Sequence, residues 1–233
     1  MKKDLVIIIN GGGTNGAELK SLYKHLNENE KYFVYYPGFL PGGFVGGYFP
    51  KSTTVDFIRF IDETIEMINE DFNKVYLIGY SLGACTTAII AARSEKINKV
   101  VLIAPIIKNP KYSKFLRGLG KSLAYAKNLT RIQKIFYKEF ISRFSKVPKI
   151  HILHLELYLH YTKRYLKMIT QPTLIVETLQ DEMVKKKSID FLVKQIKNDT
   201  VVRYPVDTSH FLFFDKNIRK DVMSRIAEFL EEE

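Results

Sequence analysis

A serine flanked by two glycines, set between a buried strand and a small-residue helix, restricts the fold of this chain more than any other feature. The apolar run 75–78 predicts the strand, and the alanine-rich run 84–92 predicts the helix. Between them Gly79, Ser81 and Gly83 form a G-x-S-x-G turn with the serine at its apex. Side chains two residues before and after the serine would collide across so tight a turn. We therefore expect a strained turn that places the Ser81 hydroxyl above the edge of a parallel sheet.

Strand and helix alternate along most of the chain. Short apolar runs predict strands at 5–9, 33–36, 75–78, 100–104, 173–176 and 201–204. Amphipathic helices are predicted at 17–26, 188–197 and 218–230, and another begins after Ser52 or Thr53 with Ile58, Ile61, Ile65 and Ile68 on one face. Such alternation implies a parallel sheet with right-handed crossovers. We predict an α/β fold with about six mostly parallel strands and helices on both faces.

The alternation stops between Pro105 and Thr170, and this segment is also strongly basic. It holds 15 Lys or Arg against two acidic residues, in a chain of 233 residues with net charge +11. Residues 150–159 alternate with period two, but spacing of four through Leu157, Tyr161 and Tyr165 favours a helix. A second apolar helix face is predicted at Leu129, Ile132, Ile135 or Phe136, and Phe140. We divide the chain into an α/β core, 1–104 and 171–233, and a basic helical cap insertion, 105–170.

Three residues in loops after predicted strands suit nucleophilic catalysis. A serine hydroxyl is a weak nucleophile that needs an adjacent base, and the base needs an orienting carboxylate. Of the five histidines, His210 alone lies in a loop directly after a core strand. Asp181 follows the fifth strand, and Asp207 is a rival in the histidine's own loop. We favour Asp181, because a residue so near His210 in sequence is poorly placed to reach the far ring nitrogen.

Acyl transfer also requires hydrogen-bond donors for the developing oxyanion. The backbone N–H of Leu82, directly after the serine, is one candidate. The loop 11–13 after the first strand offers bare glycine backbone for the second, and Gly12 is the preferred residue. The carboxyl ends of parallel strands lie at one edge of a sheet. These groups are therefore expected to converge there.

The same loop matches a dinucleotide-binding G-x-G-x-x-G pattern through Gly11, Gly13 and Gly16. That reading requires an acidic residue near the end of the second strand to hold the ribose hydroxyls. Residues 33–37 contain none. A P-loop is excluded because no Gly-Lys-Ser/Thr follows. We therefore expect no nucleotide cofactor.

The remaining metal-ligating residue types do not form a recognisable site. His151, His154 and His160 lie close in sequence, but no cysteine and no set of carboxylates accompanies them. Cys85, the single cysteine, lies one turn into the helix after the serine, where it is expected to be a small buried apolar side chain. No metal is expected. The apolar run 5–9 is too short for a signal peptide or a membrane span, so the protein is expected to be cytoplasmic.

The chain resembles the α/β-hydrolase superfamily, and within it the small bacterial carboxylesterases that are similar to monoacylglycerol lipases. The segments 79–83 and 172–184, Ser209 with His210, and the closing helix 218–230 carry the resemblance. It implies that Ser81, Asp181 and His210 form a catalytic triad and that the inserted helices cap an acyl pocket. Two departures stand out. The first loop begins Asn10–Gly11 where the family usually has His-Gly, and the family's leading hairpin is missing.

These observations lead to an expected activity and expected partners. We expect a serine hydrolase that cleaves carboxylic acid esters, with short to medium acyl or monoacylglycerol-like substrates, through an acyl-enzyme on Ser81. An aminopeptidase or amidase on the same scaffold and a non-catalytic binding module are the alternatives. The basic cap is expected to contact anionic lipid weakly. No nucleic-acid-binding motif is present, and the sequence leaves the oligomeric state open.

Overall fold

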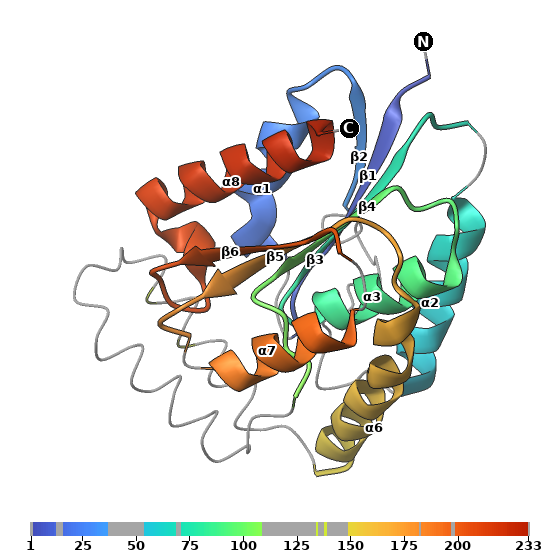
Figure 1. The fold of residues 1–233 in the computed structure, drawn as a ribbon, viewed down its shortest axis with the longest axis vertical. Helices are drawn as coiled ribbons and strands as arrows, with labels where there is room; N and C mark the ends of the chain where they lie inside the picture. Colours follow the sequence, from blue (N-terminus) through green and yellow to red (C-terminus); the bar gives the residue numbers. More distant parts are fainter. Residues whose placement is uncertain are drawn as a thin grey trace.

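Six apolar runs pair into one parallel sheet (Figure 1). The structure, a computed structural model, describes residues 2–12, 16–36, 54–68, 71–108, 134, 138, 149–181, 183–196 and 199–232. The strands are β1 (Asp4–Ile9), β2 (Tyr32–Tyr35), β3 (Val75–Tyr80), β4 (Lys99–Ile103), β5 (Thr173–Thr178) and β6 (Val201–Val206). Their order is β2-β1-β3-β4-β5-β6, and every neighbouring pair is parallel. The predicted fold class and all six predicted strands are confirmed.

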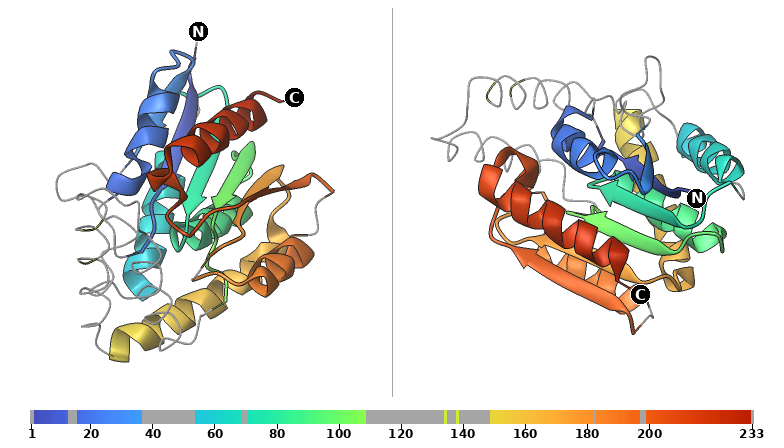
Figure 2. Two further views of the ribbon diagram at one scale, coloured as in Figure 1. Left: turned by 90° about the vertical axis from the view of Figure 1, so that its left-hand side faces the viewer. Right: turned by 90° about the horizontal axis from the view of Figure 1, so that it is seen from above.

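Helices cover both faces of this sheet (Figures 1 and 2). The α-helices are α1 (Lys20–Asn27), α2 (Thr54–Met67), α3 (Gly83–Arg93), α6 (Lys149–Tyr165), α7 (Lys186–Gln195) and α8 (Lys216–Glu231). Among the described residues there are also three short 3₁₀ helices, η1 (Ala17–Leu19), η3 (Leu166–Met168) and η4 (Leu212–Phe214). Helices α1 and α8 lie on one face, and α2, α3, α6 and α7 lie on the other.

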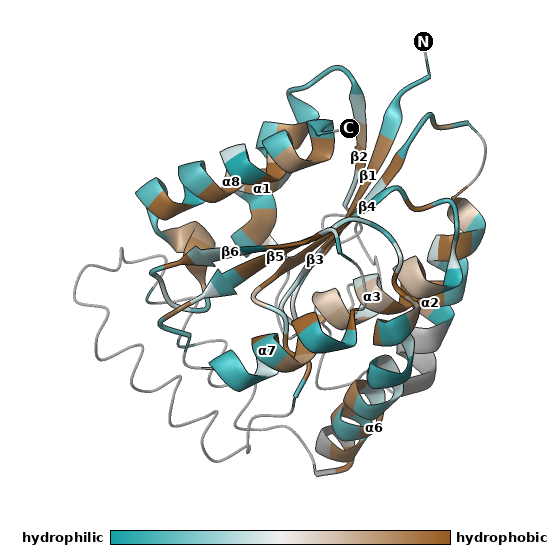
Figure 3. Ribbon diagram, viewed as in Figure 1, coloured by the Kyte–Doolittle hydropathy of each residue, from teal (hydrophilic) through white to brown (hydrophobic). Residues whose placement is uncertain are grey.

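The core lies between the central strands and α3. Every residue of β1, β3, β4 and β5 is buried, as expected for strands covered on both faces. Figure 3 shows these strands as apolar, whereas α7 and α8 carry polar and apolar stripes. Helix α3 is built from small residues, and nine of its eleven residues are buried. Its small side chains let it pack close to the sheet, so the serine turn that precedes it is firmly placed.

Helix α6 confirms the helical reading of residues 150–159. Its buried side is centred on Tyr158 and Thr162, which are fully buried, and the Tyr158 hydroxyl lies 2.7 Å from that of Thr86 on α3. Leu157 instead is 51% exposed, together with Ile150 and Leu153 on the same side of the helix. The spacing of four therefore predicted the helix correctly. The side of the helix that packs against the core contains Tyr158 and Thr162, each one residue after the predicted Leu157 and Tyr161.

Several expectations fall outside the described residues. Within 109–148 only Lys134 and Lys138 are described, as exposed helical residues, so the predicted face from Leu129 to Phe140 cannot be placed. The same holds for the caps predicted at Ser52 or Thr53 and for the side chain of Ile58. Within the described part of the chain no helix combines the length and the apolar character needed to cross a bilayer.

The loops that carry the predicted site lie at the carboxyl ends of neighbouring strands. Gly11 and Gly12 follow β1, Ser81 follows β3, Asp181 follows β5, and His210 follows β6. Two backbone hydrogen bonds join the last two loops, from the Leu179 N–H to the Val206 carbonyl at 2.9 Å and from the Gln180 N–H to the Thr208 carbonyl at 3.0 Å. The predicted convergence at one edge therefore occurs.

Candidate active site

The turn at Ser81 has the strained backbone that the sequence predicts. Its φ angle is 56°, in the left-handed region that residues other than glycine rarely adopt. Strand β4 holds it there, because the Ser81 N–H donates to the Ile103 carbonyl at 2.8 Å and the Ser81 carbonyl accepts from the Ile106 N–H at 3.2 Å. The serine is thus fixed on both sides by the neighbouring strand and the loop that follows it.

The two glycines around the serine are required by close packing, as expected. A Cβ atom on Gly79 would overlap the Thr87 hydroxyl and lie 2.7 Å from the Ala84 Cα. A Cβ atom on Gly83 would overlap the Asn10 carbonyl oxygen, which belongs to the loop after β1. Real Cβ atoms do not approach so closely. The glycines therefore let α3 pack directly beneath the turn.

Ser81, His210 and Asp181 form a continuous hydrogen-bonded chain. The Ser81 Oγ lies 2.8 Å from His210 Nε2, and His210 Nδ1 lies 2.8 Å from Asp181 Oδ2. The side chains of His210 and Asp181 are each 1% exposed, and Ser81 is 5% exposed. A carboxylate can only accept here, so Nδ1 carries the proton and Nε2 is left as the acceptor for the serine hydroxyl. This is the arrangement in which an imidazole can remove a proton from a serine.

Asp181, and not Asp207, faces the histidine ring. Its Oδ1 accepts hydrogen bonds from the Met183 and Val184 N–H groups, both at 2.7 Å. Its Oδ2 accepts from the Thr178 hydroxyl as well as from His210. Asp207 is exposed and accepts from the Gln180 side chain at 2.9 Å. In this geometry Asp181 is hydrogen-bonded to the imidazole, whereas Asp207 is hydrogen-bonded to Gln180.

Tyr80, directly before the serine, holds the histidine loop and was missed by the sequence analysis. Its hydroxyl donates to the His210 carbonyl at 3.0 Å, and its ring centroid lies 5.4 Å from that of the imidazole. The Phe213 ring lies edge-on to the Tyr80 ring, with the two ring centroids 6.3 Å apart. A buried tyrosine hydroxyl usually has a hydrogen-bond partner. The position of Tyr80 at the end of a buried strand could therefore have predicted that it bonds to a loop at this edge of the sheet.

The glycine loop after β1 lies against the serine turn. A Cβ atom on Gly11 would be 3.0 Å from the Ser81 Cβ, and one on Gly12 would be 2.9 Å from the Leu82 Cδ2. The two expected oxyanion donors, Gly12 and Leu82, are thus neighbours. Neither backbone N–H donates to another residue among those that the structure describes.

Two further predictions concern Gly16 and the cysteine. Gly16 has a φ of 81° at the start of η1, and its carbonyl accepts a hydrogen bond from the Tyr36 hydroxyl at 2.7 Å. Its place in the glycine pattern is therefore explained by a turn. Cys85 is fully buried, its thiol donates to the Ile106 carbonyl at 3.0 Å, and burial raises the pKa of the thiol to about 12. A thiol held neutral in this way is a poor nucleophile.

Among the described side chains, no group of three His, Cys, Asp or Glu residues could hold a metal ion. The side chain of His151 is not among those described. His154 and His160 lie on α6, and not in the loops that carry Ser81, Asp181 and His210.

The comparison with protein families decides the class of this chain. The family described as "Serine hydrolase (FSH1)" matches residues 48–222, about three quarters of the sequence. The chain belongs to this serine hydrolase family. The match includes Ser81, Asp181 and His210. The fold described above is also that of a solved α/β-hydrolase from Saccharomyces cerevisiae, with a TM-score of 0.67 at 12% identity.

This serine hydrolase is similar to proteins described as esterases and lipases. Over 227 residues it is 22% identical to "Putative esterase/lipase 3" of Mycoplasma genitalium, covering 95% of this chain and 79% of that protein. A metagenome-derived lipolytic enzyme from the work on LipS and LipT has a TM-score of 0.72 at 15% identity, covering 99% and 95% of the two chains. The monoacylglycerol lipase of Paleococcus ferrophilus has a TM-score of 0.65 at 21% identity, covering 97% and 93%. At these identities the solved structures establish a shared fold.

Proposed function

We propose that this serine hydrolase cleaves carboxylic acid esters of small or medium alcohols through an acyl-enzyme on Ser81. The observation that carries the proposal is the buried chain from Ser81 Oγ through His210 to Asp181, with 2.8 Å at each step. The strained turn, which holds the serine at the strand edge, supports it further. Membership of a serine hydrolase family is consistent with this reaction.

In the proposed mechanism His210 Nε2 takes the hydroxyl proton as Ser81 Oγ attacks the ester carbonyl. Asp181 holds the imidazole by Nδ1 and stabilises the imidazolium that forms. The tetrahedral oxyanion accepts hydrogen bonds from the Leu82 and Gly12 N–H groups. The imidazolium then protonates the leaving alcohol, and water activated by His210 releases the acid from the acyl-enzyme. No metal or cofactor takes part.

The proposed substrates carry short to medium acyl groups or resemble monoacylglycerols. The names of the relatives support this choice, since they describe an esterase/lipase, a lipolytic enzyme and a monoacylglycerol lipase. The proposed cap, residues 105–170, would contribute the apolar part of the acyl site. Its apolar residues favour acyl esters over peptides.

The test is hydrolysis of p-nitrophenyl esters, from acetyl to long acyl chains, by the wild type and by Ser81→Ala. We expect the substitution to lower kcat by about 10⁴-fold or more, because it removes the nucleophile. Cys85→Ala is the matched control, since Cys85 is a nucleophilic residue type near the turn, on the first turn of α3. It should retain activity, because the pKa of its thiol is raised to about 12 and the neutral thiol does not attack.

A parallel series of aminoacyl arylamides separates esterase from amidase. If the amides are turned over faster than the esters, the protein is an amidase and not an esterase, and the serine mechanism still holds. Ester hydrolysis that survives Ser81→Ala would contradict the assignment of the nucleophile. The chain length with the highest kcat/KM measures the size of the acyl site.

A further inference from the structure

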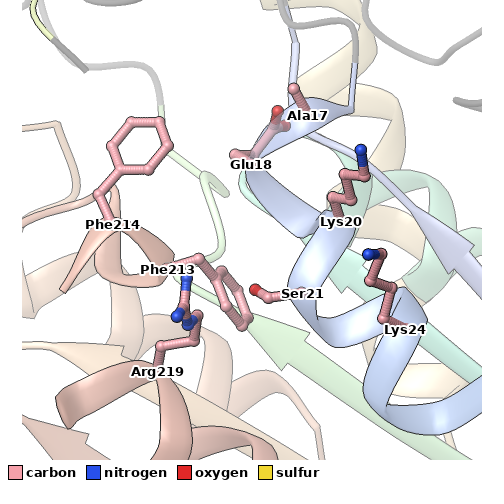
Figure 4. Close-up of a pocket in the computed structure, with 8 residues that line it drawn as sticks. All are labelled: Ala17, Glu18, Lys20, Ser21, Lys24, Phe213, Phe214 and Arg219. Atoms are coloured by element: carbon pink, nitrogen blue, oxygen red, sulfur yellow. The ribbon is translucent and has the colours of Figure 1, made fainter. Parts of the chain in front are cut away.

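A cavity of about 330 Å³ lies between the start of α1, the loop after His210 and helix α8 (Figure 4). None of Ser81, Asp181 and His210 lines it. Its lining residues come from two stretches that are far apart in sequence, 17–24 and 213–219: Ala17, Glu18, Lys20, Ser21, Lys24, Phe213, Phe214 and Arg219. The cavity is therefore distinct from the hydrogen-bonded chain of the proposed active site.

Three cationic residues line this cavity and have no carboxylate partner among the described residues. They are Lys20 and Lys24, one turn apart on α1, and Arg219 on α8. Other arginines in the described part of the chain do form ion pairs, such as Arg203 with Glu177 at 2.5 Å. Glu18, which is buried, is the one acidic residue of the lining. Because three basic residues outweigh it, the net charge around the cavity is positive. An anionic ligand would be attracted to it.

The remaining lining is apolar on one side and offers a hydroxyl on the other. Phe213 is 3% exposed and Phe214 stacks on Phe211 with ring centroids 6.0 Å apart, so the aromatic wall is rigid. Figure 4 shows the Phe213 ring between the Ser21 hydroxyl and the Arg219 guanidinium. A guanidinium recognises carboxylate and phosphate oxygens with paired hydrogen bonds. The lining thus combines an anion-binding group with apolar surface.

We propose that this cavity binds a small organic anion, with a carboxylate or phosphate head group on Arg219, a short apolar part against Phe213 and Phe214, and Lys20 and Lys24 adding to the positive potential of the lining. The site lies next to the histidine loop. Phe213 contacts Tyr80 edge-on, and the Tyr80 hydroxyl holds the His210 carbonyl. Two side chains, those of Phe213 and Tyr80, therefore link a ligand in this cavity to the His210 backbone.

The proposal is tested by calorimetric titration of the full chain with hexanoate, hexyl phosphate and hexanol at constant ionic strength. We expect at least one of the two anions to bind with a Kd of about 1 mM, and hexanol not to bind measurably. Comparing hexanoate with hexyl phosphate shows whether the site prefers a carboxylate or a phosphate. Arg219→Gln should weaken binding of the preferred anion about tenfold, because it removes a charge-assisted hydrogen bond.

Matched variants distinguish this cavity from general attraction of anions to a basic protein. Lys24→Gln should weaken binding about threefold, since exposed ion pairs contribute less. Arg219→Lys keeps the charge but loses the paired hydrogen bonds, so it should weaken binding by less than Arg219→Gln does. Lys220→Gln removes the neighbouring charge on α8, which is exposed and outside the cavity, and should leave the Kd unchanged. Melting temperatures of all variants verify that they are folded.

Three outcomes would overturn the proposal. One is that neither anion binds the wild type at ligand concentrations up to about ten times the expected Kd. Another is that Arg219→Gln and Lys220→Gln have the same effect, which would place binding elsewhere. The third is that hexanol binds as tightly as the anions, because the cationic residues would then have no role.

Discussion

At the scale of single residues, the orientation of His210 depends on groups that never contact the serine. Asp181 accepts hydrogen bonds from two backbone N–H groups and from the Thr178 hydroxyl, so its carboxylate cannot rotate away from the ring. Tyr80 fixes the other side of the histidine, through the His210 carbonyl. Each contact restricts a different part of the same residue. The imidazole is thereby held against the Ser81 hydroxyl, as the proposed proton transfer requires.

We propose that Tyr80 is a positioning residue, so its loss should slow the chemical step. We expect Tyr80→Phe to lower kcat for ester hydrolysis about tenfold and to change KM less than about twofold, because the hydroxyl orients the base and does not touch the ester. The free energy of unfolding should fall by about 1 kcal/mol, the usual contribution of one hydrogen bond. Steady-state kinetics and urea unfolding measure the two effects.

Tyr76→Phe provides the control, since Tyr76 is a buried tyrosine on the same strand whose hydroxyl lies 3.5 Å from Asp4 Oδ2. That substitution should affect stability without lowering kcat. Equal kcat values for the two variants would mean that the Tyr80 hydroxyl has a structural role alone.

At the scale of elements, a buried lysine joins β4 to the end of α8. Lys99 is 7% exposed, and its Nζ donates to the carbonyls of Phe229 at 2.7 Å, Leu230 at 3.5 Å and Glu232. The last carbonyls of a helix have no partner within the helix, and a cation is favourable there. This contact anchors the closing helix, which in turn carries Arg219 and follows the His210 loop.

We expect Lys99→Met to lower the free energy of unfolding by about 2 kcal/mol near pH 7, because three carbonyls lose a charged donor. Lys74→Met, at an exposed position, should change it by less than about 0.5 kcal/mol. Chemical denaturation of both variants measures the difference. Equal stabilities would contradict a role for Lys99 in anchoring α8.

The loss caused by Lys99→Met should also depend on pH. Burial lowers the pKa of the Lys99 ammonium from its ordinary value of 10.5. Between the lowered pKa and 10.5 the unfolded chain therefore binds more protons at this site than the folded protein does. Stability conferred by Lys99 rises with pH in that interval. The difference between the wild type and Lys99→Met should grow there, and a difference that shrinks would contradict the assigned direction.

At the scale of the whole molecule, the positive charge is concentrated in one segment. Residues 105–170 hold 15 basic and two acidic residues of the +11 chain. We propose that this segment attracts the protein weakly to anionic lipid surfaces, since basic residues near such a surface contribute about 1 kcal/mol each. Co-sedimentation should be observed with vesicles containing anionic lipid, and it should weaken as salt is added.

Lys134 and Lys138 are exposed helical residues of this segment, which makes them suitable for charge reversal. The double substitution Lys134→Glu, Lys138→Glu should lower vesicle binding about tenfold or more. Lys186→Glu with Lys187→Glu, also exposed but on α7, is the control and should have a smaller effect. Binding that depends neither on anionic lipid nor on salt would rule out the attraction.

Much of this molecule follows from local sequence patterns. The six strands, the helices between them and the turn at Ser81 were predicted because apolar periodicity and glycine placement act over a few residues. The meeting of Ser81, Asp181 and His210 was predictable as well, since each follows a strand and the carboxyl ends of parallel strands share an edge. The sequence by itself therefore determined the architecture and the residues gathered at its edge.

The tertiary structure decided what depends on rotation and distance between remote segments. It placed Asp181 against the imidazole and turned Asp207 toward Gln180. It also joined Tyr80 to the His210 carbonyl across 130 positions of sequence, and buried the Tyr158 side of α6 instead of the Leu157 side. The cavity beside Arg219 likewise exists only where α1, η4 and α8 meet. Sequence periodicity does not specify such contacts, because they arise from how complete elements pack against each other.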